Sequence, residues 1–327
     1  MRIRWAALAV VIVAFSDPSS AASQQVGKIA RVGILDVGFS YPERQALWSD
    51  FRNALREAGY VEGKNVAFEF RWGSGQVGTL RELAGELVRA NVDVIVTAGT
   101  PAALAAKQTT RSIPIVLVLA GDPVRTSLAA NLGRPGGNVT GLTTLSTELS
   151  AKRLELLRQL LPTITQLGIL WDENPAFALA IQDTELAARA MNVSVRTVVV
   201  RSRDELETAF AEFARLRVGA LEVMPTPIVL SERRRVADLA VKHRLPTIYA
   251  QREYVEAGGL LSYGSNLRQL FLRAAIYVDK ILRGSRPADL PIEQPTTFEL
   301  AINLRTAKVL GLTVPPSLQA RADLIVE

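Results

Sequence analysis

Two segments of the chain share a pattern that decides the fold. VDVIVTAGTPAA (residues 92–103) aligns without gaps to VGALEVMPTPIV (residues 218–229), which sets Thr100-Pro101 against Thr226-Pro227. Each segment joins a short apolar run to a threonine and a proline, residues that favour the start of a helix. The sequence therefore contains two strand-to-helix corners of the same kind, more than a hundred residues apart.

Two further pairs of segments stand in the same order around these corners. RVGILD (31–36) resembles QLGILWD (166–172), and IPIVLVL (from 113) starts like LPTIYA (from 245). Each match alone is weak, because unrelated strands are often built from the same few apolar residue types. Their shared order and comparable spacing predict two lobes of similar build.

Short apolar runs alternate with longer helical patterns along most of the chain. Continuous hydrophobicity indicates strands that are covered on both faces, and repeated strand-helix-strand units give parallel sheets with right-handed crossovers. We therefore expect an α/β protein with two Rossmann-like lobes. The expected strands span 29–35, 65–70, 93–98, 113–119, 166–171, 193–200, 220–224, 246–250 and 259–264, and the expected helices span 43–58, 78–90, 147–161, 176–191, 203–215, 230–243 and 266–283.

The first 22 residues have the order of a secretory signal peptide. Arg2 and Arg4 precede an uncharged run from Trp5 to Phe15, and small polar residues follow. That run is too short to span a bilayer, which needs about 20 residues. We expect cleavage near residue 21 or 22 and a mature protein in the periplasm. With no cysteine in the chain, no lipid anchor is expected.

Composition excludes several function classes. The absence of cysteine and the single histidine, His243, argue against thiol nucleophiles, catalytic triads and His/Cys metal sites, so no metal or cofactor is expected. The formal charge of +6 is spread among 32 acidic residues, which does not indicate nucleic acid binding. No nucleophile elbow, phosphate-binding loop or dinucleotide fingerprint is present. We expect a protein that is not an enzyme.

In open parallel sheets, ligands bind outside the carboxyl ends of the strands. Thr100 and Pro101 follow one strand directly, and Asp122 follows the next one in the sequence AGDPV. Asp36 and Asp172 occupy matched corners after the two GIL strands. A carboxylate at such a corner suits a ligand ammonium or hydroxyl, although it also serves as an ordinary helix cap. Both interpretations stay open for each of these side chains.

Aromatic residues also gather near the corners. For each one taken alone a place in the core is favoured, and the group as a whole favours a ligand-facing role for two or three of them. They are Phe39, Tyr41, Trp171, Tyr249, Tyr254 and Tyr263.

Longer phrases of the sequence resemble a known family. The chain resembles the ABC transporter substrate-binding proteins, a family that includes tryptophan- and tyrosine-import binding proteins, over nearly its whole mature length. The resemblance is carried by REAGYVEGKNVAFEFRW (56–72), LVRANVDVIVTAGTPAALAAKQTTRSIPIV (87–116), GDPV (121–124), GRPGGNVTGL (133–142), KRLELLRQLLP (152–162), SYG (262–264), KILRGSRPADLPIE (280–293) and LAINLRTAKVLGLTVPP (300–316).

The resemblance implies the type I periplasmic-binding-protein fold, with three chain crossings at the hinge. It implies a first lobe of residues 28–141 plus 266–290 and a second of 142–265 plus 291–327. Together, the corners and the resemblance give twelve expected ligand-binding residues: Asp36, Thr100, Pro101, Gly121, Asp122, Thr143, Thr144, Asp172, Asn174, Thr226, Tyr249 and Tyr254.

The expected function is the solute-binding component of an ABC importer. We expect a monomer that captures an amino acid or a small carboxylate between closing lobes and delivers it to a membrane permease. A binding module for an extracytoplasmic sensor is the alternative, and an exported hydrolase or transferase on the same scaffold is a weaker one. The segments PTPIV (225–229) and AQREYVEAGG (250–259) depart from the family pattern where the second lobe would meet ligand, which leaves the solute open.

Overall fold

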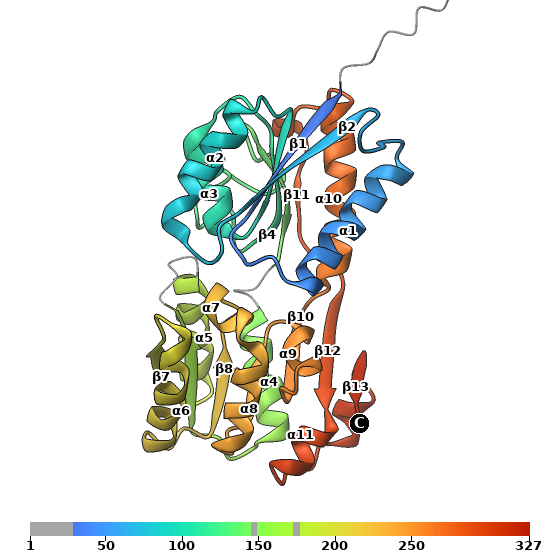
Figure 1. Cartoon of the computed structure of the whole chain (residues 1–327). Coiled ribbons are helices and arrows are strands. Elements are labelled where there is room, and N and C mark those ends of the chain that lie inside the picture. The colour runs from blue at the N-terminus through green and yellow to red at the C-terminus, as the bar shows by residue number, and fades with distance from the viewer. Residues whose placement is uncertain (1–28, 145–148, 173–176) are drawn as a thin grey trace, which may run out of the picture.

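The computed structural model describes residues 29–144, 149–172 and 177–327. They form two α/β lobes joined by several chain segments (Figure 1). The expected signal peptide, residues 1–22, lies outside the described residues. No helix in the described part is long and apolar enough to cross a membrane.

The first lobe contains a six-stranded sheet in the order β11-β5-β4-β3-β1-β2, and all of its paired strands are parallel. Helices α1 and α10 cover one face and α2 and α3 the other. The strands are β1 (Ala30–Asp36), β2 (Val66–Trp72), β3 (Val94–Ala98), β4 (Ile115–Ala120), β5 (Val139–Thr143) and β11 (Ile292–Glu293). The helices are α1 (Pro42–Glu57), η1 (Val77–Thr79), α2 (Leu80–Arg89), α3 (Thr100–Thr109), α10 (Leu267–Leu282) and η4 (Pro287–Asp289).

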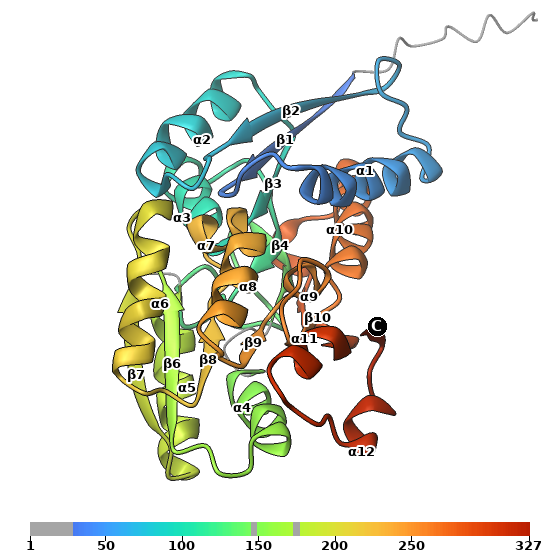
Figure 2. The same ribbon diagram turned by 60° about the horizontal axis from the view of Figure 1, so that its bottom comes forward.

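The second lobe contains a seven-stranded sheet in the order β13-β12-β10-β9-β8-β6-β7. Its C-terminal strands and helices lie at the edge opposite β7 (Figure 2). The strands are β6 (Gln166–Trp171), β7 (Ser194–Val199), β8 (Ala220–Val223), β9 (Thr247–Tyr249), β10 (Leu261–Ser265), β12 (Phe298–Asn303) and β13 (Leu324–Val326). The helices are α4 (Leu149–Leu160), α5 (Ala178–Ala190), η3 (Arg203–Glu205), α6 (Leu206–Arg215), α7 (Pro227–Ser231), α8 (Arg233–Lys242), α9 (Arg252–Glu256), α11 (Leu304–Val309) and α12 (Pro316–Gln319).

The two sheets repeat one strand order. In the first lobe β2-β1-β3-β4-β5 are neighbours, and in the second β7-β6-β8-β9-β10 are neighbours in the same sequence. The three pairs of similar segments in the sequence form equivalent strands, namely β1 and β6, β3 and β8, and β4 and β9. The expected α/β fold of two similar lobes is confirmed.

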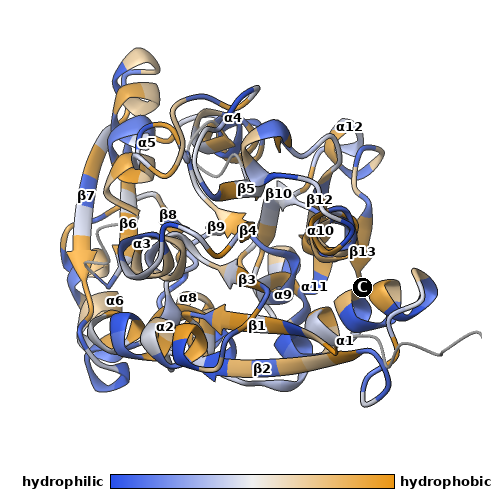
Figure 3. Cartoon of the chain, turned by 90° about the horizontal axis from the view of Figure 1, so that it is seen from above, coloured by the Kyte–Doolittle hydropathy of each residue, from blue (hydrophilic) through white to orange (hydrophobic). Residues whose placement is uncertain are grey.

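Apolar strands form the core of each lobe. Strand β1 is hydrophobic over most of its length (Figure 3). In the first lobe, the ring of Trp48 on α1 packs edge-on against Phe271 on α10, with 4.8 Å between ring centroids. Both side chains are fully buried, and each such burial contributes about 1.5–3 kcal/mol. This contact brings together helices that are far apart in the sequence.

The structure differs from the sequence-based expectation in a few elements. The expected helix 230–243 is two helices, α7 and α8, which meet at Glu232. Strand β12 runs antiparallel to β10, so the second sheet is mixed rather than wholly parallel. The reason is the direction of entry: β10 runs toward the first lobe, and β12 returns from it (Figure 1).

The chain passes between the sheets three times, after β5, after β10 and after β11. Ser265 ends β10, and its Oγ donates a hydrogen bond to the carbonyl of Thr144 just past β5, at 2.5 Å. The lobe limits implied by the resemblance stay a prediction. Strand pairing differs from them at two points, because β5 continues to Thr143 and β11 pairs with β5 in the first sheet.

A substitution of Gly141 tests how closely β5 packs against β4. Its φ is +120°, and an added Cβ would overlap the backbone nitrogen and oxygen of Leu117 on β4. We expect Gly141→Ala to cost at least about 2 kcal/mol more unfolding free energy than Gly136→Ala. Gly136 also has a positive φ, +71°, but its Cβ would meet nothing within 4 Å. Urea denaturation of both variants measures the difference, and equal losses would contradict this account of β5.

Candidate functional site

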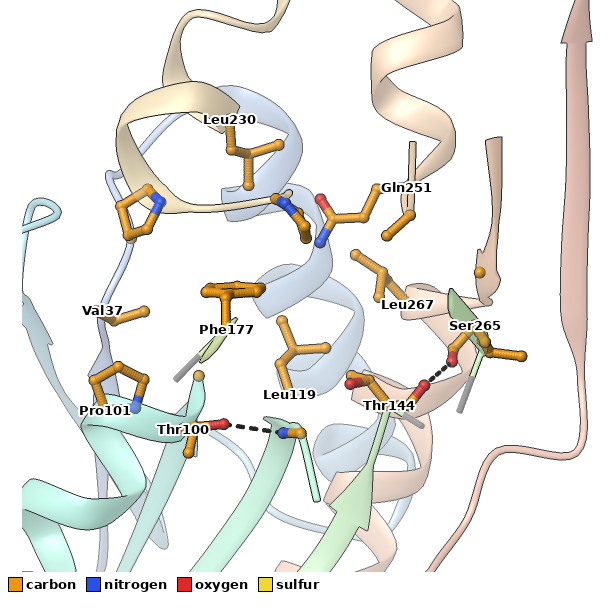
Figure 4. A pocket seen from close by; sticks show the side chains of 18 of the residues that line it. Val37, Thr100, Pro101, Leu119, Thr144, Phe177, Leu230, Gln251, Ser265 and Leu267 are labelled. Atoms are coloured by element: carbon orange, nitrogen blue, oxygen red, sulfur yellow. Dashed lines mark hydrogen bonds between the residues drawn. The ribbon is translucent and has the colours of Figure 1, made fainter. Parts of the chain in front are cut away.

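A cavity lies between the two lobes, where the strand ends of both sheets meet (Figure 4). It encloses about 890 Å³ of empty space, part of which is open to solvent. Both lobes line it, as do Leu149, Ser265 and Leu267 near the crossings. The site therefore forms only when the lobes are together.

The first lobe lines the cavity with the corners after β1, β3 and β4. The strand order reverses between β1 and β3, which is where ligands bind in open α/β sheets. Gly99, between β3 and α3, has a φ of +99°, and its Cβ would come within 2.6 Å of Val37 Cγ1. Glycine thus allows the corners after β1 and β3 to approach closely. The lining residues from these corners are Val37, Gly38, Gly99, Thr100, Pro101, Leu119 and Gly121.

Thr100 and Gly121 hold two of these corners together. Thr100 Oγ1 accepts a hydrogen bond from the Gly121 amide at 2.9 Å, and Thr143 Oγ1 donates one to the Gly121 carbonyl at 2.6 Å. Thr144 Oγ1 lies 3.1 Å from the Ala120 carbonyl, to which it donates. These hydroxyls therefore fix the cavity wall, while Pro101 presents its ring to the space (Figure 4). Of these expected residues, Thr100, Pro101, Gly121 and Thr144 line the cavity, whereas Thr143 supports it from behind.

Asp36 does not line the cavity, although it ends β1 at the expected corner. Its carboxylate is fully buried and accepts hydrogen bonds from Gly38 N, Trp48 Nε1 and Arg44, the last through Nε at 2.7 Å and Nη2 at 3.1 Å. Arg44 lines the cavity in its place. The carboxylate therefore positions a cation at the wall rather than meeting solute itself.

The second lobe contributes a mostly apolar wall. Phe177 lies between Leu119 of the first lobe and Leu230 of the second, and Gln251 approaches from the side (Figure 4). Pro225, Pro227 and Ala250 complete this wall. Among its described lining residues, the polar side chains are those of Gln251, Arg153 and Ser265.

Arg153 on α4 brings a second buried cation to the cavity. Its Nε donates to Glu222 on β8 at 2.6 Å, and only 2% of either side chain is exposed. Thr184 on α5 donates to the other oxygen of Glu222 at 3.0 Å. Each lobe thus holds one arginine at the cavity through a carboxylate of its own, which itself does not line the space.

The other expected acidic and hydroxyl residues lie outside the lining. Asp122 Oδ1 accepts from the amides of Val124 and Arg125, both at 2.9 Å, as a helix-type cap does. Asp172 Oδ2 lies 3.4 Å from the Ile228 amide at the start of α7. Thr226 is fully buried, and no hydrogen-bond partner of its Oγ1 stands among the described residues. Asn174 lies outside the described residues.

Tyr249 and Tyr254 are core residues of the second lobe. Their rings stack 4.4 Å apart, and neither side chain is exposed or lines the cavity. Burial raises the pKa of both hydroxyls above the ordinary value of 10.0. For these two tyrosines, the interpretation that strand-end aromatics close the core is the one that fits the structure.

Sequence reasoning missed Arg44, Arg153, Phe177 and Gln251. Gln251 comes two residues after β9, at the corner equivalent to Gly121 and Asp122, so the corner rule could have found it. Arg44 and Arg153 lie on helices rather than at strand-to-helix corners, so a search of the corners does not find them. Among the described residues, no cluster of three potential metal ligands occurs.

Two ion pairs join the lobes beside the cavity. Arg125, after β4, lies 2.7 Å from Asp183 on α5, and Arg233 on α8 lies 2.5 Å from Glu43 on α1. The Arg233 guanidinium also stacks over the ring of Tyr41, 4.9 Å from its centroid, and burial raises the pKa of the Tyr41 hydroxyl to about 12. These contacts require the closed arrangement of the lobes.

Comparison with known proteins places the chain in a family. The family described as "ABC transporter substrate binding protein" matches residues 31–326. A tyrosine-binding protein of Clostridioides difficile is 27% identical over 277 residues, which cover 83% of this chain and 78% of that protein.

Solved structures agree with that assignment. A conserved domain protein of Vibrio cholerae is 28% identical, with a TM-score of 0.85 over 91% of this chain and 100% of its own. An ABC domain of Streptococcus pneumoniae in complex with L-Trp is 25% identical, with a TM-score of 0.84 over 91% of this chain and 99% of its own. The chain therefore belongs to the ABC transporter substrate-binding protein family.

Proposed function

We propose that this chain captures a small, largely apolar solute in the cavity between its lobes and releases it chemically unchanged to an ABC permease. The observation that carries the proposal is the cavity between the lobes, whose walls come from both of them. A ligand that contacts both walls favours the closed state over the open one. Closure would then present the permease with a surface that only the loaded protein has.

Family membership supports binding rather than catalysis. The cavity lining also favours it, because the polar groups at the corner of Gly121 are bonded to one another and do not flank a reacting atom. We further propose that the protein works as a monomer in the periplasm after removal of residues 1–22. Service to a sensor instead of an importer is the competing function, and loss of solute uptake when the gene is deleted would distinguish the two.

The ion pair between Glu43 and Arg233 should stabilise closure. Burial alone would raise the pKa of Glu43, but hydrogen bonds from the backbone and from Arg233 outweigh it and lower the pKa below 4.5. A depressed carboxyl pKa contributes stability above the unfolded value that is lost as pH falls through the folded value. We expect a coupling energy of about 0.5–1 kcal/mol near neutral pH between Glu43→Gln and Arg233→Gln, decreasing below pH 4.5.

A double-mutant cycle by urea denaturation measures this coupling. The matched control is Arg252 and Glu256, an ion pair of 2.7 Å within α9 that does not join the lobes. Only the pair that joins the lobes should also change the affinity for ligand. Equal effects of both pairs on ligand affinity would contradict the role in closure.

Phe177 should contribute directly to solute binding. A thermal-shift screen of amino acids and small carboxylates should identify a ligand, because binding to the folded form alone raises the melting temperature. We expect Phe177→Ala to weaken that ligand by about tenfold, the scale of losing an aromatic contact and its buried area. Leu186→Ala on the exposed side of α5, where the side chain is 62% exposed, is the control and should leave affinity unchanged. Unchanged affinity in Phe177→Ala would remove this ring from the site.

A further inference from the structure

The charged groups that line the cavity in the described part of the chain are of one sign. Of the lining residues that the structure describes, Arg44 and Arg153 are cationic and none is acidic. Glu148 and Glu173 lie outside the described residues and are not counted. Each arginine belongs to a buried ion pair, Arg44 with Asp36 and Arg153 with Glu222, and in both pairs the carboxylate stands away from the lining. Both pairs are therefore dipoles whose positive ends face the cavity.

Three of the acidic residues at or near the strand-end corners stand away from the cavity lining. Asp36 accepts hydrogen bonds from three residues within its own lobe, and Asp122 caps two backbone amides. Glu253, two residues past Gln251, lines a separate hollow together with Glu43 and Arg233. None of the three lines the cavity between the lobes.

The start of α3 adds to the same polarity. This ten-residue helix begins at Thr100, and both Thr100 and Pro101 line the cavity. A helix N-terminus carries a partial positive charge from its unbonded amides. It acts here beside Arg44, whose side chain is only 7% exposed and whose charge is therefore weakly screened by water.

A positive electrostatic field in the cavity distinguishes between ligands that have the same apolar part but differ in charge. A carboxylate in the cavity interacts favourably with both guanidinium groups, while an ammonium group loses its hydration and meets cations instead of an anion. The remaining wall is apolar and suits a ring or branched chain, through Leu119, Phe177, Leu230 and Leu267.

We propose that the solute is a small apolar monocarboxylate that lacks an ammonium group, such as an arylalkanoate, and that the corresponding amino acid binds more weakly. The inference rests on the proposed function, because it assumes that the cavity between the lobes is the solute site. It distinguishes this chain from its relatives whose descriptions name tyrosine or L-Trp.

Two matched ligand series test the inference by titration calorimetry. The phenyl series is 3-phenylpropionate, L-phenylalanine and 2-phenylethylamine, and the indole series is indole-3-propionate, L-tryptophan and tryptamine. Within at least one series, we expect the carboxylate to bind about tenfold or more tightly than the amino acid, and the amine to bind least. If ligands bind but the carboxylate binds more tightly than its amino acid in neither series, the inference is overturned and the proposed function stands. If no member of either series binds, both are overturned for solutes of this size.

A substitution of Gln251 tests the same preference for a carboxylate over an amino acid. It lines the cavity from the second lobe, and Gln251→Glu introduces a carboxylate of nearly equal shape there. We expect this variant to weaken the carboxylate and to shift the preference toward the amino acid by about tenfold. Gln159→Glu, at an exposed position on α4, is the matched control and should keep the wild-type preference. An unchanged preference in a folded Gln251→Glu protein contradicts the charge argument, and the ligand series on the wild-type protein decides the matter if the variant does not fold.

Discussion

A carboxylate without access to water, that of Asp36, holds three parts of the first lobe in place. It fixes the backbone after β1 through Gly38, it anchors Arg44 at the cavity wall, and it bonds the indole of Trp48, which packs against Phe271. Because a buried charge is tolerated only when it is paired and hydrogen-bonded, these contacts depend on one another. The core of the lobe and the wall of the cavity thus share one electrostatic support.

The second lobe also holds a buried arginine at the cavity wall, but it does so with different elements. Its buried pair, Arg153 and Glu222, joins α4 to the middle of the sheet instead of joining a strand end to the first helix. The repeated strand order explains why the cavity lies at matched corners of the two sheets, and the different supports explain why the two walls are not alike. The first wall is built from glycine, threonine and proline corners, and the second from larger apolar side chains.

The sequence predicted where strands and corners lie better than it predicted which way their side chains point. Strand limits and the corners at Thr100 and Gly121 follow from apolar runs and helix-start residues, which act locally. Whether Asp36 faces solute or core depends on Arg44 and Trp48, which become its partners only once α1 packs on β1. Tyr249 and Tyr254 likewise stack because β9 and α9 meet in the fold. Such choices arise from tertiary packing, so local patterns left both interpretations open.

The three chain crossings also govern when each lobe can be completed during synthesis. The first lobe obtains α10 and β11 only after every strand from β6 to β10 has been made, and the second obtains β12 and β13 last. Neither lobe is therefore complete on a partial chain, and contacts such as Trp48 with Phe271 must form across most of the sequence. Long-range contacts of this kind slow folding.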